Sequence, residues 1–221
     1  VNEKVRHLAG IGLAKAEDMI DATQNADVFV EVSGLLKAMA VNLTKICNDL
    51  RLLASGPYAG LGEIRLPERQ AGSSIMPGKV NPVIPEAVNQ VAYSVMAADL
   101  AITLAAQAGQ LELNAFLPLV AHYLLGSLTM LTNAANCLAT LCIKDITARP
   151  DRCQELLAGS SSLATALAPY IGYDKATEIA REAYLSGKTV ETVAQEISGL
   201  TKEELAAILR PQAMTRPGRS K

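Results

Sequence analysis

The chain has 221 residues, enough for one or two domains with a sizeable core, and half of those residues are hydrophobic. Only 4% are aromatic and none is tryptophan, so alanine and leucine supply the apolar surface, which favours closely packed helices over sheets. A formal net charge of −2 argues against nucleic acid as the main partner, because binding to phosphates needs a basic face.

The start of the chain and its cysteines bear on location and metal binding. The chain starts with valine rather than methionine and shows no charged-then-apolar secretion signal, so we expect a fragment or a trimmed product. It has four cysteines, none in a CxxC pair: Cys47, Cys137, Cys142 and Cys153. The two histidines lie far from plausible co-ligands. We therefore expect reduced cysteines in the core, no metal site and a cytoplasmic protein.

The first long helix is expected over 26–55, after a short helix and a polar connection in 1–25. Asn25 or Asp27 is its predicted N-cap, and Gly56-Pro57 ends it. Apolar residues recur through it at helical spacing: Val28, Leu35, Leu36, Met39, Leu43, Ile46 and Leu50.

Two more long helices are expected, over 83–107 and 117–143, after an irregular segment at 58–82. The run 91–111 is nearly apolar and long enough to cross a membrane, but Asp99 lies in its middle, where a charge would be costly in lipid. We therefore expect no membrane partner. Helices that are apolar all round need other helices to cover them, from the same chain or from neighbouring chains.

After residue 148 the predicted segments become shorter, so we place a domain boundary there. The predicted helices of this part are 151–157, 162–168, 174–186, 190–197 and 201–209. Thr201 and Glu204 have the spacing of a capping box, and the basic tail 216–221 is expected to fray. The sequence thus predicts an all-α protein, with a long-helix bundle in residues 1–148 and a small helical domain in 149–221.

A polar loop, 72–82, with the sequence GSSIMPGKVNP, stands between long apolar segments. Long loops inside compact helical chains are usually functional or disordered. This one holds two adjacent hydroxyls, an ammonium group and an amide, which can grip a carboxylate while one hydroxyl serves as a base. The helix N-terminus that comes after it favours anions. Because of its glycines we expect the loop to be mobile.

The loop sequence resembles the signature of the aspartase/fumarase superfamily. Similar segments also occur elsewhere in the chain, at 47–57, 109–114, 171–176 and 210–214. Within the superfamily, 21–25 and 81–90 resemble aspartate ammonia-lyases, whereas 171–176 is closer to fumarases. The resemblance implies a cofactor-independent lyase that eliminates ammonia from the dicarboxylate L-aspartate to give fumarate. A class II fumarate hydratase is the first alternative, and a non-catalytic helical assembly module is the second.

The resemblance also implies roles for residues of the loop. Ser73 matches the base of the family, and Ser74 beside it supports substrate binding. Lys79 and Asn81 match the pair that binds the substrate carboxylate, although Asn81 is also a plausible helix cap. The alternative for Ser73 is a hydroxyl that only bonds to its own loop.

The resemblance implies supporting roles for three further residues. Glu86 matches a glutamate that orients a histidine of the family; that histidine is absent here, so Glu86 has no expected partner. Gly72 and Met76 shape the loop. Tyr58 stands where the family usually has an arginine after Ser-Gly-Pro.

The resemblance finally bears on completeness and assembly. The family's first domain and the first part of its helical domain have no counterpart in these residues. Those parts hold an anion-binding segment and a Thr-His pair that the family uses for substrate, so we expect the isolated chain to be inactive. Family members are homotetramers with a central helical core and active sites built from three chains. We therefore expect a homotetramer.

Overall fold

The computed structural model describes residues 1–215 and confirms the all-α fold class. It divides the chain into two compact units, Val1–Thr147 and a second unit that begins at Ala148. Each unit has its own apolar core. The predicted fraying of the tail concerns residues 216–221, which lie outside the described residues.

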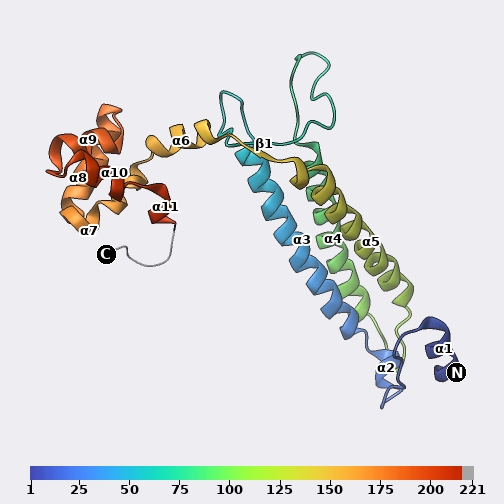
Figure 1. Ribbon diagram of the computed structural model, residues 1–221. Coiled ribbons are helices and arrows are strands. Elements are labelled where there is room, and N and C mark those ends of the chain that lie inside the picture. Colours follow the sequence, from blue (N-terminus) through green and yellow to red (C-terminus); the bar gives the residue numbers. More distant parts are fainter. Residues whose placement is uncertain (216–221) are drawn as a thin grey trace. The chain divides into compact units, whose positions relative to one another are not determined.

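Three long helices build the first unit: α3 (Asp27–Leu53), α4 (Val83–Gln107) and α5 (Leu117–Leu141). They lie side by side, and α4 packs extensively against both α3 and α5, whereas α3 and α5 touch little (Figure 1). The predicted helices agree with these bounds to within two residues. Helix α5 ends slightly early, and the 3-10 helix η1 (Ile143–Asp145) comes after it.

Short elements complete the first unit. Helices α1 (Asn2–Ala9) and α2 (Asp21–Gln24) precede α3. Strand β1 (Ile64–Arg65) pairs with β2 (Thr147–Ala148) in a two-stranded sheet. The segment between α3 and α4 is therefore irregular, as predicted, apart from this one short strand.

The predicted N-cap of α3 is wrong. Ala26 occupies the cap position and offers no side-chain hydrogen bond, while Asp27 is already inside the first turn. Asn25 instead ends α2, where its side-chain amide donates to the Asp21 carboxylate. Only two residues separate α2 from α3 along the chain. The first, Asn25, is the C-cap of α2, and the second, Ala26, is therefore the N-cap of α3. Asp27 still contributes, because a carboxylate in a first turn is favoured by the helix dipole.

Small apolar residues fill the bundle between α4 and its neighbours. The buried core includes Ala40, Cys47, Val88, Ala92, Val95, Ile102, Val120, Leu131, Leu138 and Cys142. The short side chains among these residues let the helices approach closely, and the interhelix distance depends on the side chains at the contact. Among residues 1–215 no cysteine is in a disulfide, and Cys47 and Cys142 are buried in the core as predicted, whereas Cys137 and Cys153 are only half-buried. Burial, and then the neighbouring Cys142 thiol, raises the pKa of Cys47 to about 11, so this core thiol stays protonated at neutral pH.

By length and composition alone, α4 and the stretch Leu117–Asp145 could each cross a membrane. The core helices of a bundle pass the same test. In this bundle the charge in the middle of α4 faces α3: the Asp99 carboxylate accepts hydrogen bonds from Ser33 Oγ at 2.8 Å and from Lys37 Nζ at 2.7 Å. Asp99 is only 6% exposed. Burial alone would raise the pKa of this carboxyl, but the bonds from Lys37 and Ser33 outweigh that effect and lower it.

This network gives the first testable prediction. Lys37→Met is expected to lower the free energy of unfolding by about 1.5–3 kcal/mol, because Asp99 would stay buried with only the Ser33 hydroxyl as partner. Asp99→Asn is expected to be milder, since the Lys37 side chain is 50% exposed and can turn to water. Urea unfolding followed by circular dichroism measures both changes, and an equal or reversed order would contradict the account.

The same network sets a pH dependence. The folded-state pKa of Asp99 lies below its ordinary value of 3.8, so its contribution to stability is present above that pH. It is lost as the pH falls further, through the folded-state pKa. The stability difference between the wild type and Asp99→Asn should therefore shrink below about pH 4 and stay constant near neutrality.

The second unit is a cluster of short helices. They are α6 (Pro150–Ala158), η2 (Ser161–Ala166), α7 (Ala168–Ile171), α8 (Tyr173–Ser186), α9 (Val190–Ile197), α10 (Lys202–Ile208) and α11 (Pro211–Met214). Its core gathers buried side chains such as Leu167, Ile179 and Leu205. The predicted capping box is confirmed: Thr201 Oγ1 accepts from the Glu204 backbone, and the Glu204 carboxylate accepts from the Thr201 backbone.

Candidate active site in the loop before helix α4

The polar loop leaves the bundle where α3 ends and α4 begins (Figure 1). Its two arms are bonded to each other at the base: the Gly72 N–H donates to the Lys79 carbonyl at 2.7 Å, and Asn81 Nδ2 donates to the Gly72 carbonyl at 3.1 Å. A Cβ on Gly72 would lie 2.5 Å from the Lys79 carbonyl oxygen, so only glycine fits here. Residues 72–81 thus form a ring closed by these two bonds rather than a loose connector.

Ser73 is the half-buried residue at the start of this ring. Its Oγ accepts hydrogen bonds from the backbone N–H groups of Ile75 and Met76, both at 3.1 Å. A hydroxyl bonded to its own loop was the alternative interpretation of Ser73, and the geometry is of that kind. The two interpretations are compatible, because two N–H donors aimed at Oγ would stabilise negative charge on that atom.

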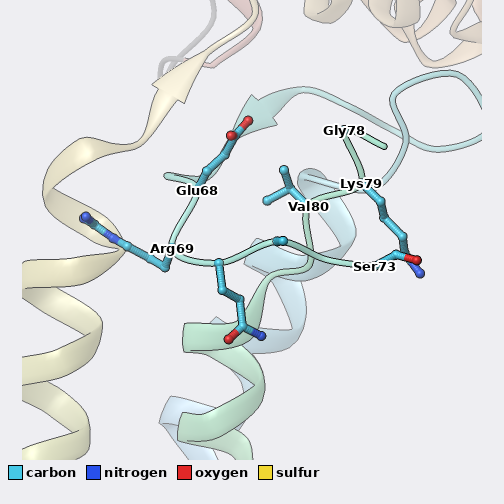
Figure 2. A pocket seen from close by; sticks show the side chains of 8 residues that line it. Glu68, Arg69, Ser73, Gly78, Lys79 and Val80 are labelled. Atoms are coloured by element: carbon cyan, nitrogen blue, oxygen red, sulfur yellow. The ribbon is translucent and has the colours of Figure 1, made fainter. Parts of the chain in front are cut away.

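A hollow of about 410 Å³ opens beside Ser73. Figure 2 shows the residues that line it, among them Glu68, Arg69, Ser73, Gly78, Lys79 and Val80. The structure therefore brings together the predicted base and the predicted carboxylate-binding lysine. Ser74 and Met76 do not line this hollow and are exposed on the ring.

Asn81 does not act as the helix cap. Pro82 occupies the N-cap position of α4, and no side chain caps it. The Asn81 amide is instead turned towards the loop, where one Nδ2 hydrogen bonds the Gly72 carbonyl. An amide carries two Nδ2 hydrogens, so one donor is left for a ligand carboxylate.

Glu86 has a partner that the sequence did not suggest. Its carboxylate lies 3.8 Å from the guanidinium of Arg51, near the end of α3, and both side chains are about 40% exposed. The expectation that Glu86 lacks a partner is therefore wrong. No local sequence pattern indicates this ion pair, since the two residues come from different helices and only the packing of those helices brings them together.

Arg69 and Glu68, which line the hollow just before Gly72, were not singled out from the sequence. The adjacent opposite charges gave no pattern of their own. Among residues 1–215 no group of three or more His, Cys, Asp or Glu side chains could hold a metal ion. The loop itself offers hydroxyl, ammonium and amide groups, and Glu68 and Arg69 add a carboxylate and a guanidinium to the lining of the hollow.

Comparisons with known proteins bear on the family of the chain. Residues 1–97 match the lyase family, and residues 163–216 match the fumarase C C-terminus family. The aspartate ammonia-lyase of Helicobacter pylori is 48% identical over 98% of this chain and 46% of that protein. Other bacterial proteins of this name reach 52% identity. The chain spans about half the length of the curated relatives that it matches.

Two solved structures share the fold. The "fumarate lyase:delta crystallin" of Brucella melitensis superposes with a TM-score of 0.92 at 49% identity, over 97% of this chain and 46% of that one. The class II fumarase of Schistosoma mansoni superposes with a TM-score of 0.87 at 33% identity, over 98% of this chain and 47% of that one. The chain belongs to the aspartase/fumarase superfamily.

Proposed function

We propose that this chain is the C-terminal half of an aspartate ammonia-lyase, which converts L-aspartate into fumarate and ammonia without a cofactor. The observation that carries the proposal is the pair of backbone N–H donors on Ser73 Oγ, next to a hollow that Lys79 also lines. Support for the substrate comes from sequence: identity to aspartate ammonia-lyases is 45–52%, against 33% to the class II fumarase.

In the proposed reaction Ser73 removes a proton from the carbon next to the substrate carboxylate. The electron pair left behind delocalises into that carboxylate, and the C–N bond on the neighbouring carbon then breaks to release ammonia. Serine is a poor base because its alkoxide is unstable in water. The N–H groups of Ile75 and Met76 supply the stabilisation that the alkoxide needs.

Lys79 and Asn81 bind the carboxylate that gains charge during proton removal. Lysine acts as a compact point charge, and the amide acts as an oriented donor. Both interactions strengthen as charge moves onto the carboxylate, so they stabilise the transition state more than the ground state. Ser74, Gly72, Met76 and Glu86 keep supporting roles in this proposal.

The identity of the substrate can be tested on a protein with the complete reading frame. The test compares ammonia release from L-aspartate with hydration of fumarate. We expect fumarate and ammonia in equal amounts, and little malate from fumarate. Malate as the main product would favour a class II fumarate hydratase. No turnover of either substrate would favour the helical assembly module.

We further propose that the chain assembles as a homotetramer in the cytoplasm, with sites completed by neighbouring chains. Large apolar side chains are exposed along all three long helices, among them Leu35, Leu52, Leu100, Leu104, Leu125 and Leu128. Burying each side chain is worth about 1.5–3 kcal/mol. The free-energy cost of leaving several of them in water would therefore exceed the usual free energy of unfolding of a domain. Packing helices of other copies against these side chains buries them and removes this free-energy cost.

Assembly gives a further testable prediction. Light scattering at micromolar concentration should show a tetramer, and Leu100→Glu should shift it towards smaller species. Leu100 is 61% exposed in the single chain, so glutamate there should leave the fold of one copy intact. Leu185→Glu, at a 66% exposed position on α8, is the matched control and should leave the tetramer unchanged. A stable wild-type monomer would overturn the proposal.

A further inference from the structure

The segment that leads into the loop is tied to the end of α5 by Arg69. Its Nε donates to the carbonyl of Leu141, the last residue of α5, at 2.7 Å, and its Nη2 lies 2.9 Å from Asp145 Oδ2 in η1. Figure 2 shows this side chain pointing away from Ser73 and Lys79. Arg69 thus lines the hollow, but its guanidinium bonds to α5 and η1 and does not face the candidate base.

Both partners of Arg69 are hydrogen-bond acceptors that a cationic donor stabilises. The last carbonyls of a helix have no partner inside it, and they carry the negative end of the helix dipole. The Asp145 carboxylate adds a full charge beside them. A guanidinium presents several donors in a fixed plane, so one side chain can bond both groups, which an ammonium on a flexible stem does less well. The Arg69 side chain is 32% exposed, so the contact is partly shielded from water.

The position of this contact matters because the arm beyond it carries the candidate base. Ser73 is four residues beyond Arg69, within about 14 Å of chain even when extended. Between them, Gly72 is bonded to the Lys79 carbonyl and to the Asn81 amide on the returning arm. The arm that carries the base therefore has two attachments, one to α5 through Arg69 and one to the arm that enters α4.

We propose that Arg69 is a positioning residue for Ser73, which rests on the function proposed above for that serine. Its bonds to Leu141 and Asp145 hold the outgoing arm of the loop, so that Ser73 stands where a proton can be removed. Lys79 and Asn81 lie on the returning arm, which continues directly into α4, so the Arg69 contact reaches them only through the bonds of Gly72. Loss of Arg69 should therefore disturb proton removal more than binding of the carboxylate.

Steady-state kinetics on a protein with the complete reading frame test the proposal. Arg69→Met should lower kcat about 10- to 100-fold, because small displacements of a catalytic group have large effects, while KM changes less than about threefold. Arg69→Lys should recover part of the loss. Asp145→Asn should cost less than Arg69→Met, since the bond to Leu141 remains. Arg65→Met, at an exposed arginine of β1, is the matched control and should leave kcat unchanged.

Hydrogen–deuterium exchange over residues 70–82 gives a readout that does not depend on activity. Exchange should rise in Arg69→Met and stay unchanged in Arg65→Met. If the wild type has no lyase activity, the proposed function fails, while the exchange result still decides whether Arg69 holds the loop. If the wild type is active, two results for Arg69→Met would overturn the positioning role. One is an unchanged kcat, and the other is a loss of kcat that a lower Tm explains on its own.

Discussion

Replacing Ser73 with alanine in a protein with the complete reading frame is expected to lower kcat about 10²- to 10⁴-fold, the usual contribution of a positioned general base. KM for L-aspartate should change little. The hydroxyl acts on the proton in the transition state, whereas the carboxylate is bound by Lys79 and Asn81. Measuring fumarate formation by its ultraviolet absorbance gives both constants.

The neighbouring hydroxyl provides the comparison. Ser74→Ala should lower kcat less than about tenfold, because Ser74 is exposed and lies outside the lining of the hollow. Circular dichroism should show the same Tm for both variants within error. If Ser73→Ala turned over at nearly the wild-type rate, or if Ser74→Ala lost more activity than Ser73→Ala, the base would have to be sought elsewhere.

Lys79→Met should weaken both binding and turnover. Methionine keeps much of the length and apolar stem of lysine but removes the charge, so the substrate carboxylate loses a charge-assisted bond, worth about 1.5–3 kcal/mol in the ground state. The extra charge of the transition state makes the loss in kcat/KM larger still, at about 10²- to 10³-fold. Binding of fumarate, measured by calorimetry, should weaken as well.

Lys79→Arg separates charge from geometry. It keeps the positive charge but presents a planar fork in place of a point charge, so it should restore binding of fumarate more than it restores kcat. A Lys79→Met variant with unchanged Kd for fumarate would show that Lys79 points to solvent in the working enzyme. Its only role would then be to line the hollow.

The helices could be predicted closely because their signals are local. Apolar spacing and the glycine and proline residues at 56 and 57 define the length of α3, and the Thr201 capping box lies within four consecutive residues. The N-cap of α3 could not be predicted in this way. Its identity depends on how α2 ends against α3, and there Asn25 bonds Asp21 instead.

In the candidate site, too, the local features could be predicted and the non-local contacts could not. The sequence indicated the chemical groups of the loop, and the resemblance indicated their roles. The bonds from Ile75 and Met76 to Ser73 require the folded ring, which spacing alone does not specify. The contact of Arg69 with Leu141 joins residues 72 positions apart, and its existence depends on where α5 ends relative to the loop. Non-local contacts of this kind become visible only once the bundle is assembled.

A crystal structure of the protein with the complete reading frame, in the Ser73→Ala form with L-aspartate bound, tests the central claim most directly. The claim is that Ser73 is the base and that Lys79 and Asn81 hold the carboxylate. The account predicts that the carbon that loses its proton lies within about 3.5 Å of the place where Ser73 Oγ stands, with the adjacent carboxylate bonded to Lys79 and Asn81. Aspartate bound away from this loop, or bound with its reacting carbon out of reach of residue 73, would contradict it.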